Sequence, residues 1–274
     1  MNELPRPLLL VGGGRMGSAL ARGWLARGLL PSDLYVVEPD EGRRLAFVGA
    51  HVVAQPAELP PELAPQVALF AVKPQVLEAV LPAYREIARR TGVLLSIVAG
   101  KPIAAFEAVF GSDRPIVRSM PNTPAQVGRG MTVLFANPAC GENERRMAEA
   151  LMAAVGEVAW VSDEDWLHAV TAVSGSGPAY VFHLVEALAQ AGERLGLPAE
   201  LAMRLARATV AGAGELLYRS GESASALREA VTSPGGTTEA ALRVLMGEQS
   251  LAALVSEAVA AAERRSRQLA AAGN

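Results

Sequence analysis

The sequence predicts an α/β protein in which a doubly wound parallel sheet is followed by an all-helical domain. Short aliphatic or β-branched runs alternate with helical patterns as far as about Trp160, which is typical of a parallel sheet covered by crossover helices. The strand signals stop at Asp163, and long alanine- and leucine-rich stretches follow. With 274 residues, 51% of them hydrophobic, the chain is large enough for two domains, which we expect to span residues 1–162 and 163–274.

Eight apolar runs are the candidate strands of the first domain. Most of them are apolar at successive positions, which is typical of strands that are buried on both faces of a sheet. They are, in order, Leu8–Val11, Leu34–Val37, His51–Val53, Val67–Val72, Val93–Val98, Ile116–Val117, Met131–Phe135 and Glu157–Val161.

The second domain is predicted to consist of helices separated by glycine, serine and proline turns. Two of these helices, Tyr180–Leu195 and Ala199–Leu217, are apolar around most of their circumference. Because so short a domain cannot bury such helices by itself, we expect a homodimer built on the C-terminal helices. The alternative is that the abundant alanine merely raises helix propensity.

Composition limits the classes of partner. The formal net charge is −3 and the arginines are spread along the chain, so no basic patch for nucleic acid or an anionic membrane is expected. No apolar stretch is long enough to span a membrane. The single cysteine, Cys140, excludes an internal disulfide and fits a reducing cytoplasm, where we expect the protein to act on a small molecule.

A glycine-rich turn follows the first candidate strand and opens a helix that is expected to run to about Arg27. Its GxGxxG pattern, between a strand and a helix, predicts a Rossmann-type dinucleotide site with the pyrophosphate at the helix N-terminus. The alternative is a purely structural turn. The residues of this turn that we expect at the cofactor are Gly12, Gly14, Arg15, Met16 and Gly17.

The choice between NADH and NADPH stays open from the sequence. Glu38 ends the second candidate strand, where an acidic side chain accepts hydrogen bonds from the adenosine ribose of NAD and repels a 2′-phosphate. Arg43 and Arg44 begin the next helix and can turn towards a 2′-phosphate, although they also fit an ordinary solvated helix face.

Two further strand ends belong to the same edge of the sheet, where open α/β sheets bind their ligands. The fourth strand ends in Ala71, Val72, Lys73 and Pro74, and the lysine either contacts the cofactor or an anionic substrate or is a surface residue at a helix start. The fifth ends in small residues including Ala99, which leave room for the nicotinamide.

Three other segments combine rigid turns with hydroxyl or amide groups. They are Met120–Pro124, which contains Asn122, Ser174–Tyr180, which contains Ser174 and Ser176, and Ser233–Thr238. A glycine-rich turn that leads into a helix N-terminus binds anions through backbone amides, so Ser233–Thr238 predicts a receptor for a substrate carboxylate. The alternative is helix N-capping by serine and threonine.

Taken together, these motifs resemble the pyrroline-5-carboxylate reductase family over essentially the whole chain. The resemblance implies a Rossmann domain followed by a helical dimerisation domain, and hydride transfer from NADPH or NADH to the C=N bond of 1-pyrroline-5-carboxylate, the last step of proline biosynthesis. It also implies that the Thr238 hydroxyl bonds the ring nitrogen. The implied substrate-binding residues are Ser233, Gly235, Gly236, Thr237, Thr238, Ser174 and Ser176, and Asn122 joins the cofactor site.

Some residues depart from the family pattern. Many members carry Ser or Thr where Glu38 stands, Glu222–Ala226 lacks a common His-Pro-Gly, and Ala230 replaces a polar residue of some members. The family often forms rings of dimers, which this sequence leaves undecided. The histidines, His51, His168 and His183, lack partners at metal-ligand spacing, so we expect them to be structural and expect no metal.

Two other classes remain as alternatives. A related imine reductase or β-hydroxyacid dehydrogenase shares the two-domain plan, but the latter needs a lysine in the helical domain and this chain has none after Lys101. A dinucleotide-sensing protein without catalysis has no need of the hydroxyl-rich loop Ser233–Thr238.

Overall fold

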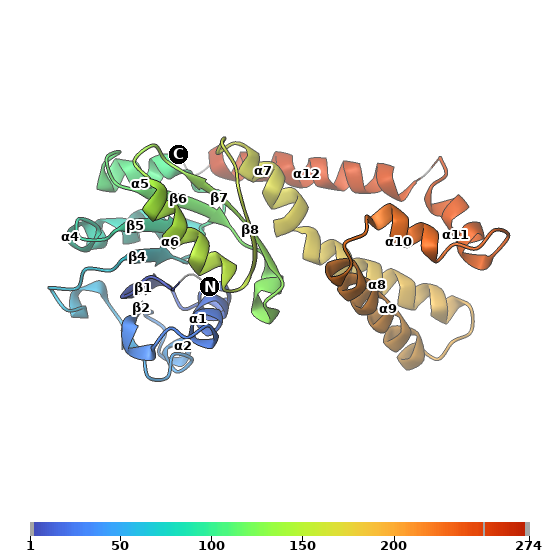
Figure 1. Cartoon of the computed structure of the whole chain (residues 1–274), viewed down its shortest axis with the longest axis horizontal. Helices are drawn as coiled ribbons and strands as arrows, with labels where there is room; N and C mark the ends of the chain where they lie inside the picture. The colour runs from blue at the N-terminus through green and yellow to red at the C-terminus, as the bar shows by residue number, and fades with distance from the viewer. Residues whose placement is uncertain (1–2, 249, 272–274) are drawn as a thin grey trace. The chain divides into compact units, whose positions relative to one another are not determined.

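The computed structural model describes residues 3–248 and 250–271, and the chain divides into two compact units (Figure 1). The sheet unit contains the chain up to Gly175 together with the segment from Glu263 onward. The helical unit is Ser176–Ala262. Each unit is described by itself below.

The sheet unit is built on one sheet of eight strands in the order β3-β2-β1-β4-β5-β6-β7-β8. The strands are β1 Leu8–Val11, β2 Leu34–Val37, β3 His51–Val53, β4 Val67–Phe70, β5 Val93–Ser96, β6 Ile116–Met120, β7 Gly130–Ala136 and β8 Gly156–Trp160. All eight lie where the sequence predicts strands, with small differences at their ends.

One pair of strands is an exception within the parallel sheet that the sequence predicts. β6 and β7 are antiparallel, whereas the other neighbours run parallel. The connection Pro121–Arg129 contains only the 3-10 helix η5, Thr123–Val127, and a parallel connection needs a crossover of a dozen or more residues. The length of this connection therefore decides the direction of β7.

Helices cover both faces of the sheet. On one face lie α1 Arg15–Ala26, α2 Glu41–Arg44 and α6 Glu142–Ala153, and on the other α3 Leu77–Val80, α4 Arg85–Ala88 and α5 Ile103–Phe110. Short 3-10 segments link them: η1 Pro31–Asp33, η2 Pro56–Glu58, η3 Pro74–Val76 and η4 Leu81–Tyr84.

The apolar runs are explained by these two layers. In β1, Leu8 and Leu10 enter the core under α1 and α6, and Leu9 and Val11 enter the core under α3 to α5. Each such side chain contributes about 1.5–3 kcal/mol when fully buried. On the α1 side the indole N–H of Trp24 also donates to the Leu151 carbonyl at 2.9 Å, which ties α1 to α6.

The sheet order places a crevice between β1 and β4. β1 pairs with β2 on one side and with β4 on the other, so the connections that leave these strands turn in opposite directions along the sheet. Such a reversal opens a ligand crevice outside the carboxyl ends of the strands. The glycine-rich turn after β1 and the segment after β4 flank this crevice.

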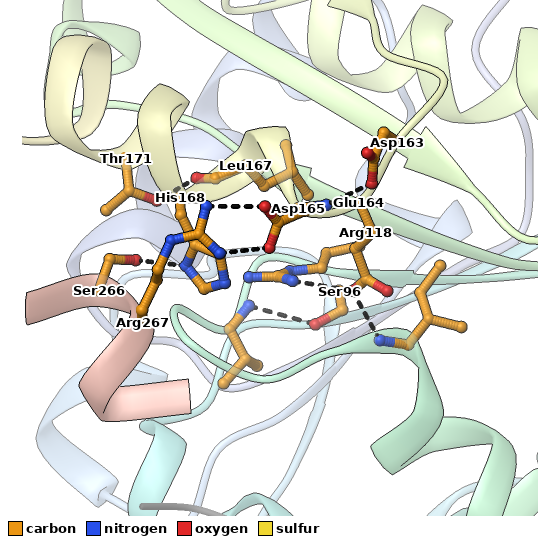
Figure 2. Close-up of polar contacts among 12 residues, drawn as sticks. Ser96, Arg118, Asp163, Glu164, Asp165, Leu167, His168, Thr171, Ser266 and Arg267 are labelled. Atoms are coloured by element: carbon orange, nitrogen blue, oxygen red, sulfur yellow. Dashed lines mark hydrogen bonds and ion pairs between the residues drawn. The ribbon is translucent and has the colours of Figure 1, made fainter. Parts of the chain in front are cut away.

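The end of the chain packs on the sheet unit through polar contacts. Arg267, near the end of α12 (Leu251–Ala271), donates to both carboxylate oxygens of Asp165 at 2.5 and 2.7 Å. Ser266 Oγ lies 2.8 Å from Nδ1 of His168 in α7 (Trp166–Val170), as Figure 2 shows. After α7 the chain passes through one π-helical turn, Thr171–Gly175.

The helical unit contains α8 Gly177–Arg194, α9 Ala199–Arg219, α10 Ala224–Ala230, α11 Thr237–Leu245 and the first part of α12. α8 and α9 pack together and are joined by a short turn in which Gly196 has a φ of 94°. The only buried apolar residues described in this unit are Ala189, Ala202 and Ala206. Large apolar side chains such as Phe182, which is 64% exposed, lie on its surface.

None of the described helices combines the length and the apolar character needed to cross a bilayer.

Candidate active site

The turn after β1 has the backbone that a dinucleotide site requires. Gly12 has a φ of 100°, and a Cβ at this position would lie 2.8 Å from the Ala71 carbonyl oxygen. A side chain at Gly17 would collide with the Gly12 carbonyl. Gly14, in contrast, faces open space, and it caps α1 without a side-chain hydrogen bond. The first amides of α1, including those of Arg15 and Met16, are therefore directed at an open cradle that fits a pyrophosphate.

Glu38 lies beside this turn, but it is buried rather than open to a ligand. The residue is 3% exposed, Oε2 accepts the Gly13 N–H at 2.6 Å, and Oε1 accepts the Asp40 N–H at 2.9 Å. Arg44 donates to the carbonyl oxygens of Glu38 and Pro39 at 3.1 and 2.9 Å. Both side chains thus hold the backbone at the end of β2.

A pocket of about 300 Å³ opens next to the glycine-rich turn. We call it the arginine pocket, because three of its lining side chains are arginines. Its lining residues are Gly13, Gly14, Arg15, Ser18, Arg22, Arg43, Ala46 and Gln126.

The segment after β4 lies on the other side of the crevice. Ala71 contacts the glycine-rich turn, with its N–H donating to the Val11 carbonyl at 2.7 Å. Val72 and Pro74 are half-buried, and Pro74 starts η3 as the sequence predicts. Lys73 is exposed, and its side chain forms no hydrogen bond or ion pair with the part of the chain that the structure describes.

Of the remaining residues predicted in the sheet unit, one is exposed and two form hydrogen bonds within the protein. Ala99 is exposed after β5. Asn122 uses both ends of its amide inside the protein: Nδ2 donates to the Ser174 carbonyl at 3.1 Å, and Oδ1 accepts the Met131 N–H at 2.9 Å. The Ser174 hydroxyl donates to the Val170 carbonyl at 3.1 Å. Asn122 therefore fixes the position of the segment that carries Ser174.

In the helical unit, the Ser233–Thr238 loop forms the N-terminus of α11. Gly235 has a φ of 70°, and Gly236 is the N-cap of α11. Thr237 starts this helix two positions before the start expected near Glu239, so Thr237 and Thr238 lie in its first turn. The Thr238 side chain is half-buried and forms no hydrogen bond among the described residues.

One residue next to this loop was missed by sequence reasoning. The Glu239 carboxylate accepts the Gly235 N–H at 2.7 Å and also pairs with Arg243 at 3.3 Å. The loop amide thus already binds a carboxylate. An acidic residue inside the first turn after Gly-Gly is the signal that would have identified it.

Arg22 was missed as well. Arg15, Ser18 and Arg22 are spaced by three and four residues in α1, which places them on one face of the helix. This spacing is visible in the sequence and would have directed attention to a basic face beside the glycine-rich turn.

His168 lies in α7, where the charges of Arg118 in β6 and Arg267 in α12 act on its ring. The ring is buried, and burial, together with the charges of Arg118 and Arg267, lowers its pKa below the usual value, while Asp165 and Glu263 oppose this effect. Arg118 is itself buried and donates to Glu164 Oε1 at 2.8 Å (Figure 2). The same oxygen also accepts the Ile103 N–H. This network joins α5, α7 and the end of α12.

Burial also raises the pKa of the Cys140 thiol, to about 11, so the thiol is protonated at neutral pH. Across the described residues, histidine, cysteine, aspartate and glutamate side chains form no group of three or more that could hold a metal.

Comparison with known proteins identifies the family. A model of pyrroline-5-carboxylate reductase dimerisation matches residues 164–269, and one of coenzyme F420-dependent NADP oxidoreductases matches residues 8–100. The chain is 39% identical to the pyrroline-5-carboxylate reductase of Pseudomonas aeruginosa over 96% of both chains. It is 42% identical to that of Synechocystis over 95% of this chain and 97% of the relative. The chain belongs to the pyrroline-5-carboxylate reductase family.

Solved structures agree with this family membership. The pyrroline-5-carboxylate reductase of Coxiella burnetii is 36% identical, with a TM-score of 0.90 over 97% of this chain and 98% of that one. The pyrroline carboxylate reductase of Plasmodium falciparum, solved with NADP bound, is 29% identical, with a TM-score of 0.82 over 98% of this chain and 100% of that one. The predicted family, the fold class and an NAD(P)H-dependent oxidoreductase are thereby confirmed.

Proposed function

We propose that the protein reduces 1-pyrroline-5-carboxylate to L-proline with NADPH or NADH, and that the Ser233–Thr238 loop holds the substrate. The observation that carries this assignment is the Gly235 amide, which already binds a carboxylate oxygen of Glu239 at 2.7 Å. A loop of glycines and hydroxyls at a helix N-terminus is suited to the carboxylate of a small substrate.

The sheet unit provides the cofactor half of the site. The amides of Arg15 and Met16 hold the pyrophosphate, Gly12 and Gly17 keep the turn tight, and Gly14 leaves it room. Glu38 shapes the turn from β2. The other residues that we assign to the cofactor follow β4, β5 and β6: Ala71, Val72, Lys73, Pro74, Ala99 and Asn122. The bound nicotinamide supplies a hydride.

The helical unit provides the substrate half. The Thr237 amide binds the carboxylate, together with the Gly235 amide once the substrate displaces Glu239 from it. Ser233 and Gly236 shape this loop, in which the Gly236 N–H donates to the Ser233 carbonyl at 3.0 Å. Ser176 contributes a hydroxyl from the start of the helical unit, and Ser174 contributes one from the end of the preceding segment of the sheet unit. The Thr238 hydroxyl oxygen accepts the N–H of the protonated imine. Because the proton is then already on nitrogen, hydride addition to the carbon completes the reduction, and positioning provides most of the rate.

We further propose that two chains pair through the C-terminal helices and that the pairs assemble into a ring in a reducing cytoplasm. Exposed apolar side chains on α8 and α9, such as Phe182 and Leu205, support the pairing. The dimerisation model that matches residues 164–269 supports it too.

The test is an assay of the purified protein with 1-pyrroline-5-carboxylate and each reduced cofactor. We expect the absorbance of the reduced nicotinamide to fall and proline to form in equal amounts. A protein that is folded, by circular dichroism, and turns over with neither cofactor would contradict the assignment.

A further inference from the structure

We propose that Glu164 is a positioning residue of the enzyme. Through the Ile103 amide its carboxylate fixes the turn after β5 that carries Ala99 to the nicotinamide. We call residues 97–102 the β5 turn. The inference rests on the proposed function only for the place of the nicotinamide at Ala99.

The N-terminus of α5 lacks a cap of its own, and this is the first observation. Pro102 stands at the N-cap position of α5, and its side chain has no atom that could accept a hydrogen bond. The first amides of a helix then need an acceptor from elsewhere. The Ile103 N–H, the first of α5, donates at 2.9 Å to Oε1 of Glu164, which lies 61 residues later in the chain. A distant carboxylate thus takes the place of a local cap and complements the positive end of the helix dipole.

A buried positive charge holds Glu164 in this place, and this is the second observation. In β6, Ile116 enters the core under α3 to α5 and Val117 enters the opposite core, so Arg118 returns to the α5 face. Arg118 is 5% exposed, and it donates to the same Oε1 of Glu164 at 2.8 Å (Figure 2). Within residues 3–248 and 250–271, no other side chain pairs with this guanidinium. Because a buried cation without its anion is strongly destabilising, Arg118 keeps the Glu164 carboxylate at the start of α5.

Hydrogen bonds also hold the β5 turn at its start and near its end. The Val98 N–H donates to Ser96 Oγ at 3.2 Å. The ammonium group of the buried Lys101 donates to Glu78 at 2.6 Å. The β5 turn is therefore a fixed segment whose position depends on its anchors.

One residue of the β5 turn is presented to a ligand. Gly100 has a φ of 74°, which reverses the chain, and Ala99 is the only residue of the turn that is exposed. Glu164 anchors the turn on the side of α5. We therefore expect a shift of Ile103 to displace Ala99.

The hydride donor is sensitive to such a displacement, whereas the other half of the cofactor is not. A misplacement of about 1 Å can cost roughly 100-fold in rate. The glycine-rich turn after β1 keeps its shape through contacts of its own, such as the Gly13 N–H that donates to Glu38. Loss of Glu164 should therefore disturb the nicotinamide and leave the pyrophosphate in place.

The experiment compares each complete cofactor with the fragment that lacks the nicotinamide, by calorimetry. The pairs are NADPH with 2′-phospho-ADP-ribose and NADH with ADP-ribose, and neither measurement requires turnover. We expect Glu164→Ala to bind the fragments as the wild type does and the complete cofactors about tenfold more weakly, the size of one hydrogen bond to a charged group. In the assay with the imine, kcat should fall by about 10- to 100-fold while KM for the imine stays within about twofold.

Two other variants separate positioning from stability. Glu164→Gln keeps an oxygen that can accept the Ile103 N–H, so it should recover most of both losses. Asp165→Ala is the matched control, because it removes the neighbouring carboxylate, which accepts hydrogen bonds from Arg267 of α12. It should leave the difference between complete cofactor and fragment unchanged.

A double variant keeps the test open if Glu164→Ala does not fold. Arg118→Leu with Glu164→Leu removes both buried charges together and leaves the Ile103 amide without its acceptor. The same selective loss is expected of this protein.

Three results would overturn the proposal. They are wild-type binding and kcat in Glu164→Ala, an equal loss of complete cofactor and fragment, and the same selective loss in Asp165→Ala, since any change beside α7 would then be sufficient. A wild type that does not reduce the imine, together with a selective loss of nicotinamide binding in Glu164→Ala, would refute the proposed function and leave this inference intact.

Discussion

The sheet unit and the helical unit differ in how far they bury their apolar side chains. The sheet unit encloses its large apolar side chains between two layers of helices, and residues such as Trp24 and Phe70 are almost wholly inaccessible. The helical unit leaves Phe182, Leu205 and Leu217 exposed, and only alanines are buried among its described apolar residues. The sheet unit is thus covered by its own helices, whereas we expect the helical unit to need a second surface against its helices.

The strongest test of this contrast places a charge on the exposed face of α8. Phe182→Asp should abolish the dimer, because a carboxylate would be buried without a partner. Light scattering after gel filtration measures the mass directly. We expect reduction of the imine to be lost together with the dimer, while the sheet unit still binds the reduced nicotinamide cofactor.

Leu45→Asp is the matched control for Phe182→Asp. Leu45 is 77% exposed in the sheet unit, and its variant should remain a dimer with unchanged activity. A dimeric Phe182→Asp protein would show that α8 is not part of the interface.

The next largest effect is expected at the glycine-rich turn, where two glycines have opposite surroundings. Gly12→Ala forces a Cβ against the Ala71 carbonyl at a φ of 100° and should cost about 1–3 kcal/mol of stability as well as cofactor binding. Gly14→Ala meets no atom within 4 Å, so it should keep Tm while its methyl group obstructs the cradle and weakens binding. Thermal denaturation and titration of the reduced nicotinamide's fluorescence separate these outcomes. Equal Tm values for both variants would contradict the assigned geometry of the turn.

The sequence predicts the sheet unit better than the sites for a physical reason. Local apolar runs identify all eight strands, because burial on both faces leaves a pattern within each segment. The return of α12 depends on contacts between distant segments: Arg267 and Asp165 lie 102 residues apart. No local pattern records such a contact.

The sites show the same limit at single residues. The position of Glu38 at the end of a strand is compatible with a ribose ligand or a buried anchor, and only the Gly13 and Asp40 amides distinguish them. Asn122 is similar: its segment indicates a rigid loop, but not that both ends of its amide are used by Ser174 and Met131. The glycines of the turn after β1, in contrast, could be predicted, because their spacing between a strand and a helix indicates their backbone role.

The substrate half is tested by removing one hydroxyl. Thr238→Ala should lower kcat by about 100-fold, the size expected for a lost hydrogen bond to the reacting group, with cofactor binding unchanged. Thr238→Ser retains the hydroxyl and should recover most of the rate. Unchanged kinetics in Thr238→Ala would remove this residue from the reaction, and a loss of cofactor binding would indicate a disturbed fold instead.

The smallest expected effect is a dependence of stability on pH that belongs to the sheet unit alone. Because burial, Arg118 and Arg267 lower the pKa of His168, the folded protein favours the neutral ring. Its stabilising contribution is complete above the ordinary imidazole pKa of about 6.5 and is lost as the pH falls from there towards the lowered value. Asp165 and Glu263 reduce this effect without reversing it.

We therefore expect the Tm of the wild type to decrease by roughly a few degrees between about pH 7.5 and about pH 5.5. His168→Asn retains a polar partner for Ser266 but cannot titrate, so its Tm should change less over the same interval. His183→Asn is the control, because His183 is 81% exposed in its side chain on the helical unit and should leave the wild-type dependence in place. If Tm of His168→Asn keeps the full pH dependence while that of His183→Asn loses it, the titrating group lies in the helical unit. The acid sensitivity of the fold then comes from the exposed helices and not from the buried contacts at the end of α12.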